Sequence, residues 1–230
     1  MKITFYAHAS FRLEGDGLTV ITDPYTPGTA KFDPINEAAD IVLMSSATDD
    51  FHSDPSHVQG NPEVVNTLHL PPEGRTVKGL VVKSFPATES LTFDYQSEYG
   101  RDPDANALYH FTLGGLRFLH MGDIGTKVPQ GHLDMLRGQV DVLLALTGEH
   151  ATIALDDLDD AMAQIGPRAV IPMHYFSAKG VLKIEPVETF TKRLPAACVT
   201  WVGDKSMILT PDMLPAKGQP PHVYVLEQSR

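Results

Sequence analysis

Cysteine and tryptophan occur once each in the 230 residues, and the chain has few basic residues: 18 Lys and Arg against 29 Asp and Glu. A single cysteine, Cys198, cannot form an internal disulfide, which favours a reducing, cytoplasmic setting. No apolar run approaches the ~18 residues that a membrane-spanning helix needs. The net charge of −11 repels phosphate backbones. We therefore expect neither a nucleic-acid partner nor a membrane partner.

The composition that remains is that of a globular domain, with 42% hydrophobic and 20% charged residues. A chain of this length is usually one large domain or two small ones, and no linker divides this one. We predict a single α+β (α/β) domain over residues 1–210. Residues 211–230 contain four prolines and are predicted to form an extended tail, packed on the domain or extending from it. The sequence leaves the oligomeric state open, a homo-oligomer included.

Clusters of β-forming residues between turn residues predict a series of short strands. They are Ile3–Tyr6, Phe11–Glu14, Leu18–Thr22, Ile41–Ser45, Gly79–Phe85, Ala107–Leu113, Leu116–Met121, Val140–Ala145 and Ala169–Pro172. An apolar stripe with helical spacing predicts a helix over Leu155–Ile165, and shorter helices are expected at His132–Arg137 and Pro186–Leu194. Val199–Val202 and Ser206–Leu209 are interpreted as a closing hairpin.

Polar side chains follow four of these strands directly. Asp50, Glu89, Asp123 and His174 each lie in the segment after a predicted strand. Ligands of layered α/β proteins bind where such segments converge, beyond the carboxyl ends of the strands. Carboxylates and an imidazole that meet there suit zinc, iron or manganese. The alternative from spacing alone is that the acids are solvated and that the histidine is a buried structural residue.

Several short segments, in this order along the chain, carry a resemblance to a known family. They are Ala7-His8-Ala9-Ser10-Phe11, Thr22-Asp23-Pro24, Gly60-Asn61-Pro62, Asp104-Ala105-Asn106-Ala107, His120-Met121-Gly122-Asp123-Ile124-Gly125 and Ile171-Pro172-Met173-His174-Tyr175. Together they resemble the metallo-β-lactamase superfamily, in the branch related to ascorbate-6-phosphate lactonase. The resemblance implies a four-layer αββα sandwich with a metal site at one edge of its two sheets.

The departures from the family pattern affect the metal ligands. The family motif H-x-H-x-D-H falls without gaps on residues 46–51, so three histidine positions are Ser46, Thr48 and Phe51, and a fourth falls on Thr88. By the family pattern Asp50, Asp123 and His174 remain as ligands. Hydroxyl groups are poor zinc ligands and a phenyl ring is none. The resemblance therefore implies at most one divalent metal (zinc, manganese or iron), or none.

A shifted register of the motif stays open. A shift of four residues supplies Asp50, His52 and Asp54, and His52 and Glu89 are in either case auxiliary ligand candidates. His8 and Asn106 are expected in the pocket, near the metal position rather than on it. If no metal is bound, we expect a protonated acid, or a histidinium at His174, to balance the carboxylates.

Three functions are compatible with these residues. The first is a hydrolase with a degraded, mononuclear site, in which a metal-activated water attacks a small ester, lactone or phosphoester and Asp50 or Asp123 accepts the proton. The second is a non-catalytic binding or scaffold protein that kept the fold. The third is a dinuclear hydrolase with His52 and Glu89 as replacement ligands.

Overall fold

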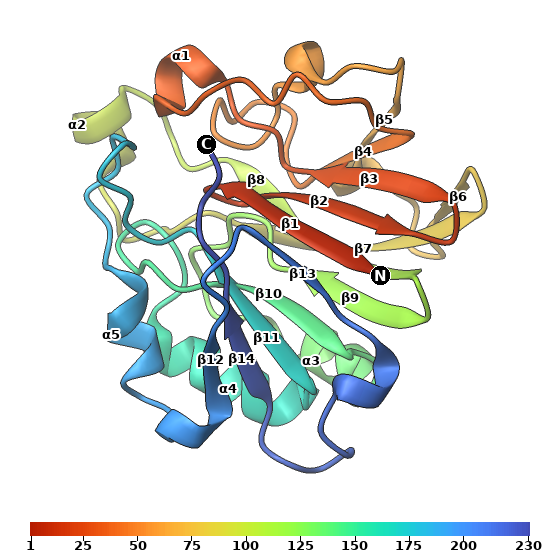
Figure 1. The fold of residues 1–230 in the computed structure, drawn as a ribbon. Helices are drawn as coiled ribbons and strands as arrows, with labels where there is room; N and C mark the ends of the chain where they lie inside the picture. The colour runs from red at the N-terminus through yellow and green to blue at the C-terminus, as the bar shows by residue number, and fades with distance from the viewer.

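Two β-sheets form the centre of the molecule (Figure 1). The computed structural model describes residues 1–230, with the side chain of Tyr99 excepted. The six-stranded sheet has the order β13 (Ser206–Ile208), β1 (Lys2–Ala7), β2 (Ser10–Gly15), β3 (Leu18–Thr22), β4 (Ile41–Met44), β5 (Glu63–Asn66). The eight-stranded sheet has the order β12 (Val199–Trp201), β14 (His222–Val225), β11 (Ala169–Met173), β10 (Val142–Leu146), β9 (Leu116–His120), β8 (Ala105–Leu113), β7 (Leu80–Thr88), β6 (Arg75–Val77).

The alternation of side chains along the strands explains why both faces of the six-stranded sheet are covered. Ile41 and Leu43 of β4 belong to the main core between the sheets, whereas Val42 and Met44 belong to a second, smaller core. Successive side chains of a strand point to opposite faces, so an apolar strand such as β4 needs a cover on each side. The segment around residues 30–39 supplies the second cover, through Phe32 and Ile35.

The outer helices complete the layers. They are α1 (Pro27–Ala30), α2 (Tyr95–Tyr99), α3 (Gln130–Leu136), α4 (Leu155–Ile165) and α5 (Val187–Thr191). Figure 1 shows α3 and α4 on the outer side of the eight-stranded sheet and α1 beyond the other sheet. The five buried residues of α4 are those of the predicted apolar stripe. Short 3₁₀ turns occupy Pro55–His57, Thr67–His69, Ala196–Cys198 and Pro211–Met213. Among the described residues, no helix is long and apolar enough to cross a bilayer.

The predicted closing hairpin is wrong. β12 pairs in parallel with β14 in the eight-stranded sheet, whereas β13 pairs antiparallel with β1 in the six-stranded sheet. The two strands are close in sequence, and Gly203 lies between them with a positive φ of 67°, as a hairpin would require. The chain instead crosses from one sheet to the other at this turn.

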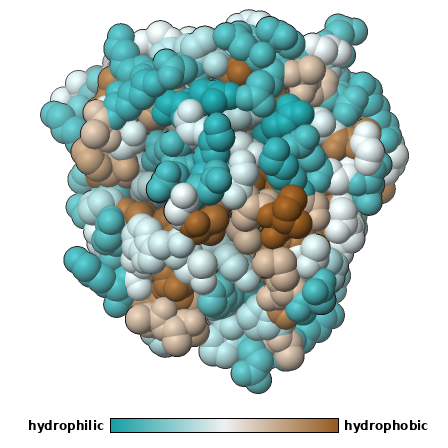
Figure 2. All heavy atoms as spheres, viewed as in Figure 1, coloured by the Kyte–Doolittle hydropathy of each residue, from teal (hydrophilic) through white to brown (hydrophobic). Residues whose placement is uncertain are grey.

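The C-terminal segment is not only an extended tail. Residues His222–Val225 form β14, which lies between β11 and β12, and Val223 and Leu226 are buried. The prolines at 211, 215, 220 and 221 all precede this strand, so none of them interrupts its ladder. On the face shown in Figure 2, hydrophilic side chains predominate over the upper, six-stranded half of the molecule.

Candidate metal centre

Three strand ends carry residues in the left-handed backbone region. His8 follows β1, Asp23 follows β3 and His174 follows β11, with φ of 58°, 36° and 51°. This region is uncommon for residues other than glycine and costs about 1–3 kcal/mol each. The backbone N–H of His174 donates to the carbonyl of His8 at 2.7 Å. This hydrogen bond brings the turns at His8 and His174 together where the two sheets meet. The side chains of His8, Asp23 and His174 are all buried there.

Three histidines form the first donor group of this edge. His8, His52 and His174 are buried, and each offers a ring nitrogen within 4.8 Å of the others. The ring centroids of His8 lie 4.0 Å from His174 and 4.9 Å from His52. His8 Nε2, His52 Nε2 and His174 Nδ1 are buried without a hydrogen-bond partner among the described residues. Buried imidazole nitrogens without a partner are what a bound ion would satisfy.

Two carboxylates form a second donor group with the same histidine. Asp49, His52 and Asp123 have ligand atoms within 4.8 Å of one another. His52 Nε2 lies 3.5 Å from Asp123 Oδ2, and His174 Nε2 lies 3.2 Å from Asp123 Oδ1. Asp49 Oδ1 accepts the N–H of Phe51 at 2.8 Å. His52 therefore belongs to both groups and is the centre of the site.

Asp23 fixes the orientation of His52 from behind. Its Oδ2 lies 2.9 Å from His52 Nδ1 and accepts the hydroxyl of Ser45 at 2.6 Å. Its Oδ1 accepts the backbone N–H of Ser45 and the hydroxyl of Tyr109. With Nδ1 engaged by the carboxylate, Nε2 of His52 is left to face the cluster. A carboxylate behind a ligating histidine is the usual arrangement at metal sites.

The turn that carries Asp123 is held by Asn106. Asn106 Oδ1 accepts the N–H of Asp123 at 2.8 Å and that of Ala107 at 2.9 Å. Gly122, with a φ of 60°, permits this contact, because a Cβ there would lie 2.3 Å from Asn106 Oδ1. Asn106 is fully buried and is absent from the residues that line the cavity described below. The sequence had predicted that Asn106 lies in the pocket. In the structure it instead holds the turn of Asp123 from behind the site.

The pKa values of His52 and Asp123 are both raised. Burial alone lowers the pKa of His52, but the carboxylates of Asp123, Asp49 and Asp23 outweigh it and raise that pKa to about 10. Burial, reinforced by Asp49, Glu89 and Asp23 against the opposing effect of His52, raises the pKa of Asp123 to about 8. A buried group of acids therefore demands a positive charge at its centre.

The other two histidines are neutral. Burial, followed by the neighbouring His52, lowers the pKa of His174 to about 3. Burial, followed by His174 and His52, holds the pKa of His8 well below its ordinary value. For a metal-free site the expectation was a protonated acid or a histidinium at His174. The lowered pKa of His174 contradicts the histidinium there, whereas the raised pKa of Asp123 favours the protonated acid. His52 is the histidine whose pKa is raised, because it faces several carboxylates. Neutral imidazoles are the form that binds metal.

The predicted ligands take different places. Asp123 and His174 are brought together, but Asp50 is exposed and lies outside both donor groups, where the adjacent Asp49 is buried instead. Glu89 is buried at the cavity, yet its two oxygens accept Arg101 Nη1 and Nη2 at 2.6 and 2.9 Å. The two outcomes have different causes: the local turn of the loop directs Asp49 inward in place of Asp50, whereas Glu89 points inward but its oxygens are occupied by Arg101.

The four positions that lack the family's histidines are also located. The hydroxyls of Ser46 and Thr48 lie 3.4 Å apart, and Ser46 is buried. The ring of Phe51 lies 5.4 Å from that of His8, and Thr88 is the last residue of β7. Asp54, from the shifted register, accepts the N–H of Ser56 and is outside both donor groups. Of the shifted set only His52 is a donor to the cluster.

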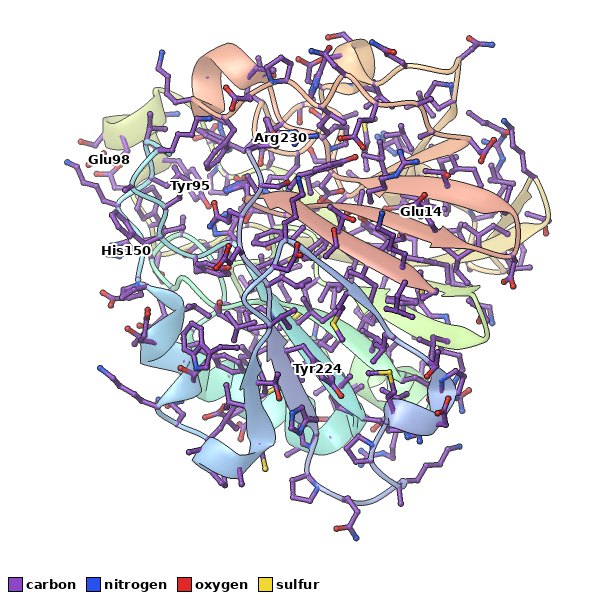
Figure 3. All side chains as sticks on the ribbon, in the orientation of Figure 1. Glu14, Tyr95, Glu98, His150, Tyr224 and Arg230 are labelled. Carbon is purple, nitrogen blue, oxygen red and sulfur yellow. The ribbon has the colours of Figure 1, made fainter. Side chains whose placement is uncertain are left out.

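A cavity of about 650 Å³ opens beside the donor groups and includes His8, Asp49, Asp123 and His174 in its lining. This volume lies within the ~300–1,000 Å³ of small-molecule sites. Tyr95 and Glu98 of α2 and His150 line it as well, and Figure 3 shows these three side chains on one side of the molecule. The cavity gives a small molecule access to Asp123 and His174.

Sequence reasoning missed Asp49 and Asp23 as site residues. Asp49 and His52 are three residues apart and are joined by a turn, since the N–H of His52 donates to the carbonyl of Asp49 at 3.0 Å. Such a turn places both side chains on one side, and the spacing Asp49-x-x-His52 was the available signal. For Asp23 the signal was an acid at a strand end beside a proline, although its partner lies 29 residues away.

The fold and the donor groups define a class: a two-sheet α/β protein with a buried His/Asp cluster of metal-ligand type at the edge of its sheets. The chain belongs to the β-lactamase superfamily, because the model of the Beta-lactamase superfamily domain matches residues 2–174.

Its relatives carry the name UPF0173 metal-dependent hydrolase. One from Carboxydothermus hydrogenoformans is 32% identical over 197 residues, covering 76% of this chain and 84% of the relative. Another, from Pelotomaculum thermopropionicum, is 28% identical over 199 residues, with the same shares of 76% and 84%. A crystal structure from Thermotoga maritima, of a candidate Zn-dependent hydrolase of the metallo-β-lactamase superfamily, matches with a TM-score of 0.72 and 27% identity. It covers 99% of this chain and 98% of its own.

These similarities confirm the metallo-β-lactamase fold, and membership in a family of metal-dependent hydrolases implies a divalent metal. The residues present fit such an ion. His8 Nε2, His52 Nε2, His174 Nδ1 and Asp123 Oδ1 are buried without a hydrogen-bond partner and belong to the residues of the two donor groups. Nitrogen with carboxylate oxygen is a donor set of zinc, iron and manganese. The ascorbate-6-phosphate lactonase branch stays a prediction.

Proposed function

We propose that the protein is a hydrolase of small ester-like molecules that uses one divalent ion: zinc, manganese or iron. The ion would bind at a mononuclear site whose ligands differ from those that the family pattern implied. The ion would be held by His52 Nε2, His174 and Asp123, with Asp49 and His8 beside them. The observation that carries the proposal is that four buried polar atoms of the two adjoining donor groups lack a hydrogen-bond partner: His8 Nε2, His52 Nε2, His174 Nδ1 and Asp123 Oδ1.

A divalent ion supplies a Lewis acid and lowers the pKa of water so that a nucleophile forms near neutral pH. The chain's own residues do the rest. Asp23 keeps His52 in the tautomer whose Nε2 faces the cluster, and Asn106 holds Asp123 in place. Asp123 and Asp49 are placed at the cavity edge, where a carboxylate can accept the proton of the attacking water. This assigns to Asp49 the role that sequence reasoning gave to Asp50.

Metal content tests the proposal. Protein purified without added metal should hold about one equivalent of a divalent ion by mass spectrometry of the metals. His52→Ala and His174→Ala should each lose most of it, because three protein ligands are the minimum of a catalytic zinc site. The matched control is His69→Ala, which removes an exposed histidine on a distant 3₁₀ turn and should leave the content unchanged.

Two other outcomes are decisive. About two equivalents per chain would contradict a mononuclear site and favour the dinuclear alternative. No metal in a folded protein, even after incubation with zinc, manganese or iron, would replace the proposal by that of a non-catalytic binding protein.

A further inference from the structure

The cavity beside the donor groups is lined by both apolar and charged side chains. The apolar side chains of Phe51, Phe93, Val181, Leu182 and Ile184, which we call the apolar wall, belong to this lining. Val181 is 47% exposed although it lines the cavity. An exposed apolar wall inside a cavity is typical of a binding site for an apolar group of a ligand.

The remaining lining is dominated by acids. It includes five carboxyl groups (Asp49, Asp50, Glu89, Glu98 and Asp123) but only two basic side chains, Arg101 and Lys183, besides three histidines. A divalent ion would neutralise only part of this charge. The whole chain adds to the effect with its net charge of −11. An anion that approaches this cavity is therefore repelled.

The one guanidinium of the cavity is already committed. Arg101 forms a two-pronged pair with the fully buried Glu89, and its Cζ lies 4.8 Å from the centre of the Tyr95 ring. A guanidinium group can bind a phosphate through two parallel hydrogen bonds. In this cavity, Nη1 and Nη2 of Arg101 both donate to the carboxylate of Glu89. A phosphoester would have to compete with Glu89 for Arg101, and Glu89 would then be left buried and unpaired.

Asp50 and Glu98 differ from the carboxylates of the two donor groups in their exposure and in their lack of a salt-bridge partner. Neither has a salt bridge with any described residue, and both are exposed. Glu98 extends from α2 at the side of the molecule where Tyr95 and His150 also lie (Figure 3). These two side chains place uncompensated negative charge at the mouth of the cavity.

Building on the proposed hydrolase function, we infer that the substrate is an uncharged carboxylic ester or lactone with an apolar acyl chain, and not a phosphoester. The apolar wall receives the acyl chain, and the acidic mouth rejects anions. Hydrolysis adds the water oxygen to the acyl carbon and breaks the bond from that carbon to the alkoxy oxygen. One water proton passes to the leaving alcohol and the other is released from the acid. The product is a carboxylate, which the same acidic lining repels and so helps to expel.

Matched substrates test the inference on the metal-loaded protein. 4-Nitrophenyl butyrate and the 4-nitrophenyl monoester of succinate share the leaving group and the four-carbon acyl chain, but only the second carries a charge. We expect kcat/KM for the butyrate to be at least tenfold higher than for the succinate monoester. It should also be about fifteenfold higher than for 4-nitrophenyl acetate, since the butyrate has two more methylenes and each buried methylene contributes about fourfold. 4-Nitrophenyl phosphate should be hydrolysed more slowly than any of these esters.

Binding gives a readout that does not depend on turnover. In saturation-transfer NMR, butanamide should show contact with the protein through its alkyl protons, and succinamate, of the same length, should show a much weaker signal. Asp50→Asn should lower the ratio of kcat/KM for the butyrate to kcat/KM for the succinate monoester several-fold. The control is Asp134→Asn, which changes an exposed acid on α3 outside the cavity and should leave this ratio unchanged.

The apolar wall has its own pair of variants. Val181→Asp should lower kcat/KM for the butyrate at least tenfold. Val81→Asp introduces the same charge at a valine of similar exposure, 50%, on β7 outside the cavity. This control variant should leave kcat/KM for the butyrate unchanged.

The outcomes separate the two proposals. Equal or faster hydrolysis of the succinate monoester or the phosphate overturns the inference about the substrate, while metal-dependent hydrolysis itself still supports the proposed function. Absence of metal-dependent hydrolysis with all four substrates, together with absence of bound metal, overturns the proposed function and with it the inference.

Discussion

Asp23 lines no part of the cavity, yet it determines which nitrogen of His52 faces the metal cluster. It is fully buried, and both of its oxygens are occupied by donors from Ser45, Tyr109 and His52. A buried carboxylate with this many partners is ionised only because each donor stabilises the charge. Asp23 thus orients a donor of the site without lining the cavity.

Replacement of Asp23 should weaken metal binding. Asp23→Asn keeps the shape but offers one oxygen acceptor where the carboxylate offered two, so His52 loses its fixed orientation. We expect the affinity for zinc to fall about 10–100-fold, as measured by competition with a chromogenic chelator. Tyr109→Phe is the control, because it removes one hydrogen bond to Asp23 without altering the contact with His52 and should change the affinity less. An unchanged zinc affinity in folded Asp23→Asn would contradict the positioning role.

At the scale of the elements, Asp141, the residue before β10, forms ion pairs with arginines at the starts of β9 and β11. Asp141 receives Nε and Nη2 of Arg117 at 2.9 and 3.0 Å, and Arg168 Nη1 lies 3.7 Å away. Burial raises the pKa of Asp141, but the hydrogen bonds and charge of Arg117, with the charge of Arg168, outweigh it and lower that pKa. The three parallel strands whose ends reach the site are therefore held in register at their opposite ends by one carboxylate.

This pKa direction predicts a dependence of stability on pH. A carboxyl group with a lowered pKa in the folded state stabilises it above the unfolded-state pKa of about 3.9. That contribution is lost as the pH falls through the lower, folded-state pKa. Asp141→Asn should reduce the free energy of unfolding by about 1–3 kcal/mol at pH 7, and the difference from the parent should shrink below about pH 4.

Urea denaturation between pH 7 and pH 2.5 measures the effect. Asp134→Asn breaks an exposed pair with Arg137 and should change stability by less than about 1 kcal/mol. A difference for Asp141→Asn that stays constant down to the lowest pH would show that the ionised carboxylate is not the source of the stabilisation.

At the scale of the whole molecule, the C-terminal segment connects the two sheets. The N–H groups of Ser229 and Arg230 donate to the carbonyl of Tyr6 in β1, although β14, just before them, belongs to the other sheet. The C-terminal segment therefore spans both sheets close to the strand that leads to His8. Loss of its packing should loosen the molecule as a unit.

A pair of identical substitutions isolates this packing. Val223 of β14 is fully buried and is aligned with Val170 of β11 and Val199 of β12. Val223→Ala should lower the free energy of unfolding by about 2 kcal/mol, since it removes two buried methyl-sized groups at about 0.8 kcal/mol each and leaves a small cavity. Val64→Ala, on the edge strand β5 where the side chain is 43% exposed, should cost less than about 0.5 kcal/mol. Equal thermal or urea stability of the two variants would contradict the structural role of β14.

The local pattern of residues by itself determined most elements and the general position of the site. Alternation and apolar runs predicted the strands Leu18–Thr22 and Ala169–Pro172, the second of which extends to Met173 in the structure, and helical spacing predicted Leu155–Ile165 with its buried face. The resemblance carried by the ordered short motifs implied the two-sheet fold and placed Asp123 and His174 at one edge. These features depend on neighbours within one element, or on strand ends that a layered sheet must bring together.

Only the tertiary structure decided which side chains enter the site and which strands pair at the chain's end. Asp49 rather than Asp50 turns inward, because a single turn joins it to His52, and His52 is held by Asp23 from a distant strand. β12 and β13 separate into different sheets, and β14 fills the place between β11 and β12. Each of these choices depends on hydrogen bonds and burial between segments far apart in the chain, which periodicity within one segment does not encode.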